Sequence, residues 1–447
     1  MPKPWWLMGQ CVFILPLSAH LTNQTRNRII MMKRREFLAA AAAGMATTAM
    51  AGKAFAQNPI DALLQSPRRG MWNDEFDSGR GDNPPGSSSV PIFSEQTPYH
   101  IEAAISDYQQ IVANGGWPVV PANEKLRLGT TSSNVPILRR RLMASGDLPR
   151  NSGTSDVFDS WVNGAVRRFQ ARHGLPDDGV MGNYTFAAMN VPANIRLGQL
   201  ETNLVRLRTM SGYLGDRYVM VNIPAAQIEA VENGKVAQRH TAIVGKIDRQ
   251  TPILNSKIHE VILNPYWTSP KSIIQKDIIP LMRKDPTYLT RNNIRIFAQD
   301  GNEIPPEMVD WTTDEAANYR LRQDPGKINA MASVKINFPN PHATYMHDTP
   351  QQSLFGKLAR FESSGCVRVQ NVRDLVSWLL RETDGWNRQR FEATIKSGES
   401  TPVQLAEPVP VYFTYVSAWS TGDGVVHFRD DIYGRDGVDE LQLSSTL

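Results

Sequence analysis

The chain has 447 residues, of which 41% are hydrophobic and 21% are charged, and its formal net charge at pH 7 is +4. This composition is typical of a globular protein, and the small net charge gives no indication of a nucleic-acid partner. Beyond the N-terminal segment, no stretch is long and apolar enough to span a membrane.

The segment from Met32 has the three regions of a secretory signal. Lys33, Arg34 and Arg35 form a basic start, residues 37–51 are small and apolar, and residues 54–56 form an A-x-A cleavage pattern. Residues 34–38 also resemble a twin-arginine signal. We therefore predict a signal peptide over 32–56 that is cleaved after Ala56, and a periplasmic protein. A short membrane anchor or a buried apolar helix is the alternative.

The thirty residues that precede this signal do not fit its usual position. Our hypothesis is that Met1 is a mis-called start and that Met31 or Met32 is the true one. An uncleaved anchor at residues 5–19 is the alternative interpretation. Residues 57–97 are rich in Gly, Pro, Ser and charge, which predicts a flexible linker.

The remaining length suggests two or three domains of about 150 residues each. Pro136 is placed to begin a helix, and an apolar stripe at helical spacing follows at Trp161, Val162, Ala165, Val166 and Phe169. We expect this stripe to be core, and the arginine runs 139–141 and 167–168 to be solvated faces. Leucines at helical spacing over 191–216 predict a helix. We expect residues 98–130 and 191–216 to form one helical scaffold.

The C-terminal half alternates in the manner of strands. Residues 217–253 read as strands joined by a hairpin at Asn233-Gly234, the strongest short-range hairpin signal. Residues 271–322 are mixed, partly helical and rich in charge, which is typical of an insertion within a sheet domain. This insertion is either a lid over a site or a surface decoration without a role.

Cys366 is one of only two cysteines, and removal of the signal would take Cys11 away. No internal disulfide is then possible, so the remaining thiol is reactive, paired with another molecule, or simply buried. Ser363, Ser364 and Gly365 make its surroundings small and polar, whereas a core cysteine more often has large apolar neighbours. This favours a functional thiol.

His347 is the candidate partner of this thiol. Residues 343–347 read as a short strand with Tyr345 and His347 on one face, and Asn371 is a candidate N-cap of an amphipathic helix that follows Cys366. An imidazole can take the thiol proton and return it to a leaving amine, while backbone N–H groups near Gly365 and Cys366 can hold an oxyanion. Arg368, two residues from Cys366, can orient a carboxylate. Considered singly, a His or an Arg is more often structural.

Residues 347–369 resemble the signature of the L,D-transpeptidases with a YkuD-like catalytic domain, in the large periplasmic branch that also carries a peptidoglycan-binding domain. Many members have a His directly before the Gly-Cys pair, where this chain has Ser364. Residues 217–253, 259–273, 324–350 and 408–436 resemble other parts of that domain, and the pattern over 162–190 resembles the peptidoglycan-binding repeat. The positions that match the signature are His347, Asp348, Thr349, Pro350, Leu354, Phe355, Ser363, Gly365, Cys366 and Arg368.

The resemblance implies a multidomain α+β protein. It would comprise a mainly-β catalytic domain over 217–440 with a mobile, partly helical capping insertion at about 271–322, and a small three-helix peptidoglycan-binding domain over 131–190. It further implies peptidoglycan stem tetrapeptides as donor and acceptor, carbapenems as covalent inhibitors, other wall-synthesis enzymes as a further class of partner, and no metal or organic cofactor.

The implied reaction is a cross-linking of third residues through a thioester on Cys366, with His347 as base and release of D-alanine. Ser363, Ser364, Gly365, Arg368 and Tyr345 would shape the oxyanion and substrate site. Two alternatives stay open: a related hydrolase that gives the thioester to water and trims or cuts stems, and a non-catalytic wall-binding scaffold with an inert cysteine.

Overall fold

A computed structural model of the chain describes residues 89–210, 212 and 214–437. The predicted start, the signal over 32–56, most of the linker over 57–97 and residues 438–440 lie outside the described residues.

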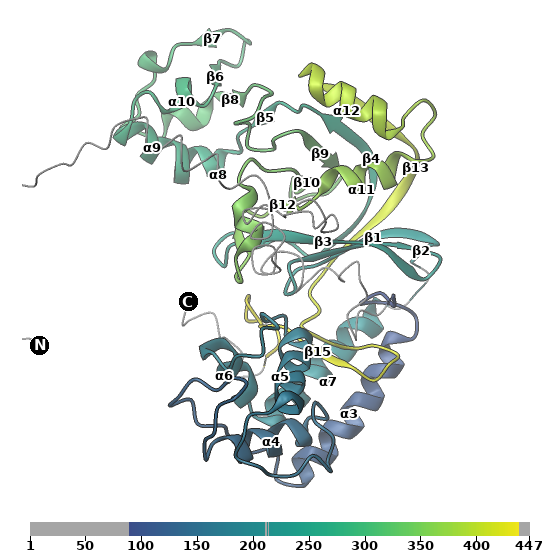
Figure 1. The fold of residues 1–447 in the computed structure, drawn as a ribbon. Coiled ribbons are helices and arrows are strands. Elements are labelled where there is room, and N and C mark those ends of the chain that lie inside the picture. Colours follow the sequence, from purple (N-terminus) through teal and green to yellow (C-terminus); the bar gives the residue numbers. More distant parts are fainter. Residues whose placement is uncertain (1–88, 211, 213, 438–447) are drawn as a thin grey trace, which may run out of the picture. The chain divides into compact units, whose positions relative to one another are not determined.

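The largest element of the fold is a nine-stranded sheet in the order β11-β3-β12-β10-β9-β4-β13-β1-β2 (Figure 1). Because β2 also pairs with β3, the sheet closes on itself into a barrel. The predicted α+β class with a mainly-β domain is confirmed. The strands are β1 (Arg217–Asn222), β2 (Gln227–Glu232), β3 (Lys235–Gly245), β4 (Leu254–Leu263), β9 (Val334–Asn337), β10 (Met346–His347), β11 (Phe361–Ser363), β12 (Val367–Val369) and β13 (Thr401–Thr414).

Local sequence explains how the barrel starts and closes. Asn233 and Gly234 join β2 to β3 with φ of 50° and 72°, the left-handed geometry that a two-residue hairpin needs, so the predicted hairpin is confirmed. The predicted strand over 343–347 is shorter than expected, because Ala343 has a φ of 52° and only Met346 and His347 pair as β10.

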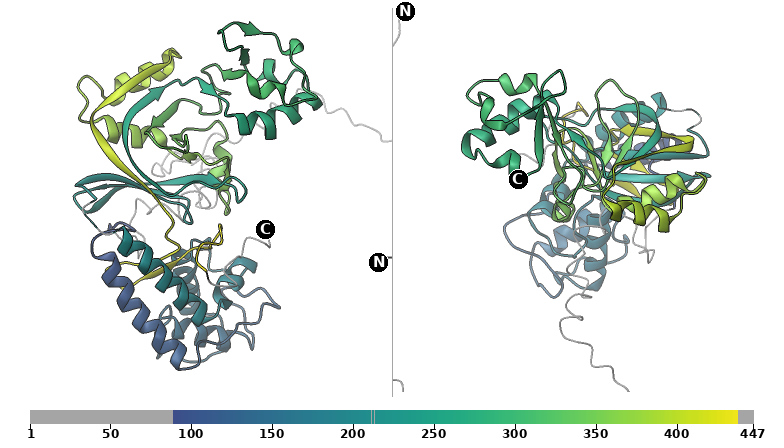
Figure 2. Two further views of the ribbon diagram at one scale, coloured as in Figure 1. Left: turned by 180° about the vertical axis from the view of Figure 1, so that it is seen from behind. Right: turned by 90° about the horizontal axis from the view of Figure 1, so that it is seen from above.

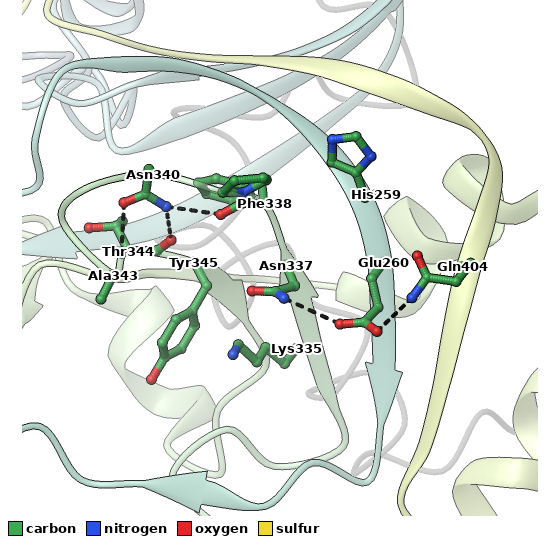
Figure 3. Close-up of a pocket in the computed structure, with 11 residues that line it drawn as sticks. His259, Glu260, Lys335, Asn337, Phe338, Asn340, Ala343, Thr344, Tyr345 and Gln404 are labelled. Atoms are coloured by element: carbon green, nitrogen blue, oxygen red, sulfur yellow. Dashed lines mark hydrogen bonds between the residues drawn. The ribbon is translucent and has the colours of Figure 1, made fainter.

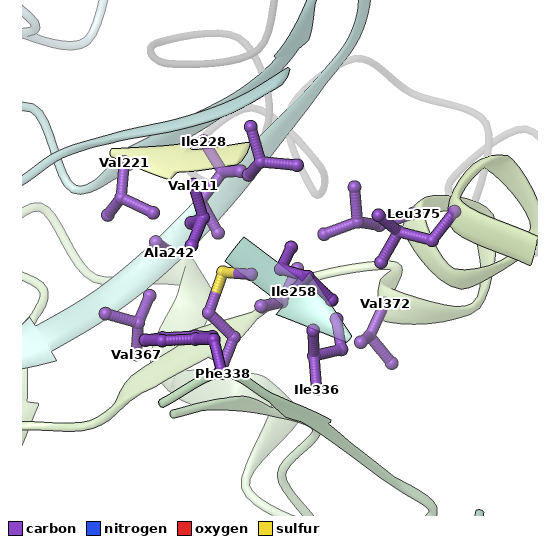
Figure 4. Close-up of a cluster of buried hydrophobic side chains, with 14 of the residues drawn as sticks. Val221, Ile228, Ala242, Ile258, Ile336, Phe338, Val367, Val372, Leu375 and Val411 are labelled. Carbon is purple, nitrogen blue, oxygen red and sulfur yellow. The ribbon is translucent and has the colours of Figure 1, made fainter. Parts of the chain in front are cut away.

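The barrel core is filled by aliphatic and aromatic side chains from the strands and from helix α11 (Val372–Leu380) (Figure 4). Val372, Leu375, Val376 and Leu379 recur at helical spacing and are buried. Asn371 precedes α11, as predicted, but it has a left-handed φ of 50° and its side chain makes no capping hydrogen bond. Helix α12 (Arg388–Ser397) adds Phe391 to the same core.

The insertion after β4 folds around a core of its own. Its four-stranded sheet has the order β5-β8-β6-β7, and its apolar side chains include Ile278, Met282, Leu289 and Leu321. The elements are β5 (Trp267–Thr268), α8 (Lys271–Ile273), the π-helix η1 (Ile274–Ile278), α9 (Ile279–Lys284), α10 (Tyr288–Arg291), β6 (Ile294–Phe297), β7 (Glu303–Ile304), the 3-10 helices η2 (Pro306–Met308) and η3 (Glu315–Asn318), and β8 (Arg320–Gln323).

Three helices form the module that precedes the barrel: α4 (Val135–Ala144), α5 (Ser160–Arg172) and α6 (Asn183–Asn190). Pro136 lies in the first turn of α4, as predicted. The Asp159 side chain caps α5 by accepting the Val162 N–H at 3.0 Å. The predicted stripe on α5 packs into the core of this module, with the exception of Trp161, which is 67% exposed.

The prediction that the arginine run 139–141 is a solvated face is wrong for two of its members. Arg139 and Arg141 are buried. Arg139 pairs with Asp159 at 2.6 Å, and Arg141 donates from Nε to the Met189 carbonyl and lies over the Trp117 ring at 3.8 Å. The run of charged residues alone predicted an exposed face, but a guanidinium can be buried where it has fixed partners.

Two long helices, α3 (Thr97–Ala113) and α7 (Ala193–Thr209), lie side by side (Figure 2). The strands β14 (Ala418–Ser420) and β15 (Val426–Phe428) form a separate hairpin that contacts α3, α5 and α7. The last part of the segment predicted for the catalytic domain therefore packs on the helices. At the end of the predicted linker, Ile92 and Phe93 are buried and the Ile92 N–H donates to Glu229, so this part of the linker is docked rather than flexible.

The remaining short helix of the described residues is η4 (Gln352–Gly356), which follows β10. A search of the described residues finds no helix with the length and apolar character required to cross a membrane.

Leu375→Ala should lower the free energy of unfolding by about 2–5 kcal/mol, because it removes a fully buried side chain of α11 from the barrel core. Denaturant unfolding followed by fluorescence would measure the loss. Val205→Ala on α7, where the side chain is 62% exposed, is the matched control and should change stability by less than about 0.5 kcal/mol. Equal losses would contradict the assigned core.

Candidate active site

Two short strands bring the predicted site residues together. β10 and β12 pair in parallel, with Met346 opposite Val367 and His347 opposite Arg368. The Val367 N–H donates to the Tyr345 carbonyl at 3.1 Å, which extends the ladder back toward Cys366. Residues that are 21 positions apart in the chain therefore become neighbours in the sheet.

The pleat decides which side chains share a face. Met346 and Val367 are fully buried in the barrel core. Since successive side chains of a strand point to opposite faces, Tyr345 and His347 lie on the other face, together with Cys366 and Arg368. The expectation that Tyr345 and His347 share a face agrees with their ring contact, at 5.5 Å between centroids.

Lys335 on β9 is a further member of this face. It pairs with His347 across the antiparallel β9–β10 ladder, between the buried Val334 and Ile336. Its Nζ lies 4.6 Å from the centre of the Tyr345 ring. Sequence reasoning missed Lys335, although the alternation of Val334, Lys335, Ile336 and Asn337 indicates a strand with one polar face.

His347 is held in one tautomer. Its Nδ1 lies 2.5 Å from the Asp348 carbonyl oxygen, which can only accept, so Nδ1 carries the proton and Nε2 keeps its lone pair. Burial, together with the nearby charges of Arg368 and Lys335, lowers the pKa of His347 to about 3. The imidazole is therefore neutral at neutral pH and able to accept a proton at Nε2.

Cys366 is half-buried and free. Burial raises the pKa of its thiol, while hydrogen bonding to Tyr345 and the charges of Lys335 and Arg368 act in the opposite direction. Among the described residues, no hydrogen bond links the thiol to His347. The site at rest thus combines a neutral thiol with a neutral imidazole rather than a thiolate–imidazolium pair.

The loop before Cys366 is fixed by its own hydroxyl and backbone. Ser363 Oγ donates to the Cys366 carbonyl at 2.5 Å and accepts the Gly365 N–H at 3.2 Å. Gly365 has a φ of 110°, which strongly favours glycine. Of the consecutive N–H groups of Gly365, Cys366 and Val367, that of Cys366 is without an acceptor among the described residues.

Thr251 supports the same loop from the other side. Its fully buried hydroxyl donates to the Gly365 carbonyl at 3.0 Å and accepts the Gly245 N–H at 2.8 Å. The hydroxyl therefore ties the end of β3 to the residue before the thiol. Sequence reasoning missed this contact, because nothing in the sequence around Thr251 indicates where it packs.

Ser364 is exposed. Its hydroxyl accepts from Arg249 Nη1 at 2.9 Å, and Arg249 also pairs with Asp277 at 2.5 and 3.0 Å. Asp277 belongs to η1 of the insertion, so one guanidinium links the insertion to the loop before the thiol. Arg249 was also missed from the sequence.

Arg368 is half-buried, and its Nη1 donates to Gln351 Oε1 at 2.8 Å. Burial lowers the pKa of this guanidinium from its ordinary value, but an arginine remains charged at neutral pH. Arg368 is therefore a second cation near the thiol. It pairs with His347 on one side, and Lys335 pairs with His347 on the other.

Two family models match parts of this chain. Residues 216–405 match the family model for the L,D-transpeptidase catalytic domain, YkuD. This part of the chain is similar to the L,D-transpeptidase catalytic family. Residues 131–189 match a second model, described as "Putative peptidoglycan binding domain". The chain therefore joins an L,D-transpeptidase domain to a peptidoglycan-binding module.

A curated relative from Haemophilus influenzae, named "Putative L,D-transpeptidase", is 36% identical over 239 residues. The match covers 53% of this chain and 48% of the relative, about half the length of each.

Among solved structures, an L,D-transpeptidase from Xylanimonas cellulosilytica aligns with 66% of this chain and 99% of its own, at 16% identity and a TM-score of 0.22. An L,D-transpeptidase in complex with imipenem aligns with 44% of this chain and 59% of its own, at 13% identity and a TM-score of 0.21.

The rate of alkylation of Cys366 should rise with pH, and the midpoint of this rise should lie above the pKa of a free cysteine thiol, which is about 8.5. The reason is that only the thiolate reacts and that burial raises the pKa of Cys366. Iodoacetamide labelling at a series of pH values, with Cys366 located by peptide mapping, measures this. Tyr345→Phe should move the midpoint further upward, since it removes a hydrogen bond that favours the thiolate. A midpoint well below 8 would indicate a resting ion pair with His347 instead.

Thr251→Val should lower the free energy of unfolding by about 1–3 kcal/mol, because it leaves the buried Gly245 N–H and Gly365 carbonyl without their partner. It should also slow the acylation of Cys366 by a substrate, because it loosens the loop before the thiol. Thr251→Ser keeps the hydroxyl and is the control. Chemical denaturation of the two variants in parallel checks this, and a loss in Thr251→Val no larger than that in Thr251→Ser would contradict the role assigned to the hydrogen bonds.

Proposed function

We propose that the protein is an extracytoplasmic L,D-transpeptidase that cross-links peptidoglycan stem peptides between their third residues. The observation that carries the proposal is the common sheet face of His347 and Cys366 within an L,D-transpeptidase domain. The peptidoglycan-binding module supports a wall location, and the predicted signal supports the periplasm.

Acylation is the first half of the reaction. Cys366 Sγ attacks the carbonyl carbon of the third residue of a donor tetrapeptide as His347 Nε2 takes the thiol proton. The peptide bond to D-alanine then breaks, and the imidazolium gives its proton to the leaving amine. The products are a thioester on Cys366 and free D-alanine, with the imidazole neutral again.

Aminolysis is the second half. The side-chain amine of a diamino acid on a neighbouring stem attacks the thioester carbon, and its proton passes to His347 and from there to the departing Cys366 sulfur. A new amide joins the two third residues. The lowered pKa of His347 keeps the imidazole neutral at rest and favours return of each proton, while the charges of Lys335 and Arg368 favour formation of the thiolate.

The other predicted residues divide into two groups. We assign the Cys366 N–H to the developing oxyanion, since it has no acceptor among the described residues, and Arg368 to a substrate carboxylate. Tyr345 orients the thiol by hydrogen bonding. Gly365 and Ser363 shape the loop, and Ser364 contacts the insertion through Arg249.

The proposal extends to carbapenems as inhibitors and to the role of the insertion. The strained carbonyl of a carbapenem offers Cys366 the same attack without an amine product that leaves, so a stable acyl adduct is expected. The insertion, linked to the thiol loop through Arg249 and Asp277, would cover a bound stem and limit access of water.

The test is incubation of the purified protein with tetrapeptide muropeptides and analysis of products by mass spectrometry, beside Cys366→Ala. We expect dimers joined through third residues and free D-alanine with the intact protein, and neither with the variant. D-alanine without dimers would indicate the hydrolase. No turnover by the intact protein would favour the scaffold, and cross-linking by Cys366→Ala would refute the mechanism.

A further inference from the structure

A pocket of about 520 Å³ is lined by Lys335 and Tyr345, two residues of the face that carries Cys366 and His347 (Figure 3). Strands β4, β9 and β13 and the loop between β9 and β10 line it. Its polar side chains are His259, Glu260, Lys335, Asn337, Asn340, Thr344, Tyr345 and Gln404. Neither Cys366 nor His347 lines the pocket. Tyr345 connects the two places, because it borders the pocket and hydrogen-bonds Cys366.

The pocket contains a carboxylate that is held in a fixed orientation. Asn337 Nδ2 donates to Glu260 Oε2 at 3.2 Å and Gln404 Nε2 donates to Glu260 Oε1 at 2.7 Å (Figure 3). Each carboxylate oxygen has a second lone pair, so Glu260 can still accept hydrogen bonds from a ligand. Two amide side chains from two other strands thus present one half-buried carboxylate to the pocket.

The same pocket contains a cation, Lys335, that forms no direct ion pair among the described residues. Burial lowers the pKa of Lys335, although the charge of Glu260 is near enough to act in the opposite direction. Among the described residues, no hydrogen bond or ion pair engages Lys335 Nζ, which lies only over the Tyr345 ring. Lys335 is half-buried on the strand between Glu260 and His347. The pocket therefore offers a positive charge near the reaction centre and a negative charge farther away, and the two are not paired with each other.

The spacing of the strands limits what can bind there. Glu260 lies on β4, and Cys366 immediately precedes β12, three strands away, which is about 14 Å at roughly 4.8 Å per strand. An amine bound at Glu260 is too far from the thioester to attack it. The side chain of the donor's third residue is attached to the acylated carbonyl through one carbon and can extend into the pocket.

We propose that this pocket is the subsite for the side chain of the donor's third residue, and that it selects a diamino acid whose terminal centre carries both a carboxylate and an ammonium. Lys335 binds the carboxylate and Glu260 binds the ammonium. The two amino-acid centres of such a residue are joined by four carbon–carbon bonds of about 1.5 Å each. Together with the length of the Glu260 side chain, these bonds can span the distance between Cys366 and Glu260. This inference rests on the proposed acylation of Cys366.

The test measures acylation alone, with no acceptor present, by D-alanine release and intact mass. Three donor tetrapeptides are compared, whose third residue is the diamino acid with its terminal carboxylate, the same residue with a carboxamide in its place, or lysine. In the unaltered protein kcat/KM should fall roughly tenfold or more from the first donor to the second, the loss expected for a charge-assisted hydrogen bond.

The variants assign the effect to residues. In Lys335→Met the ratio of kcat/KM between the first two donors should approach one. The loss of a charge near Cys366 can change both values of kcat/KM, but it should change them equally. Glu260→Gln should raise KM for all three donors and keep the dependence on the carboxylate. Lys257→Met, an exposed lysine of β4 outside the pocket, is the matched control and should keep the ratio of the unaltered protein.

A ratio near one in the unaltered protein, or a ratio that survives in Lys335→Met, would overturn this inference while leaving the transpeptidase intact. Failure of all three donors to acylate Cys366 would overturn the proposed function and this inference together. Thermal unfolding of each variant verifies that it is folded.

Discussion

The parallel pairing of β10 and β12 is the contact on which the site depends. It places Met346 and Val367 in the barrel core, and the same pleat carries Tyr345, His347, Cys366 and Arg368 to the opposite face. Because the side-chain period of a strand is two, a shift of one residue in this register would turn the imidazole into the barrel core and turn the core side chains out of it. The hydrophobic core on one side thus fixes the chemistry on the other.

This arrangement places the thiol, the imidazole and two cations close together in a partly buried site, and this burial determines which of them are charged. Burial favours the neutral forms, so the pKa of the His347 imidazole falls and that of the Cys366 thiol rises. Lys335 and Arg368 stay beside the thiol, where each favours the thiolate that forms during attack. At rest the thiol and the imidazole are both neutral. The flanking cations favour the thiolate once a substrate carbonyl is in place.

Much of this could be predicted from the sequence, because the strongest signals are local. Asn233-Gly234 determines a hairpin by its left-handed geometry, Pro136 begins a helix, and the spacing of Val372, Leu375 and Leu379 predicts α11. His347 and Cys366 were found through residue chemistry and the resemblance of a short segment. What could not be predicted depends on partners distant in sequence: Arg139 and Arg141 are buried by contacts with Asp159 and Met189, and Lys335 joins the site only through its register with His347.

The central claim is that Cys366 forms a thioester with the third residue of a stem peptide. The most direct measurement is peptide mapping by mass spectrometry of the purified protein after brief exposure to a donor tetrapeptide without an amine acceptor. The account predicts an adduct on Cys366 with the mass of the donor less D-alanine, which hydroxylamine removes and which is absent in His347→Asn. An adduct on another residue, or a full-strength adduct in His347→Asn, would contradict it.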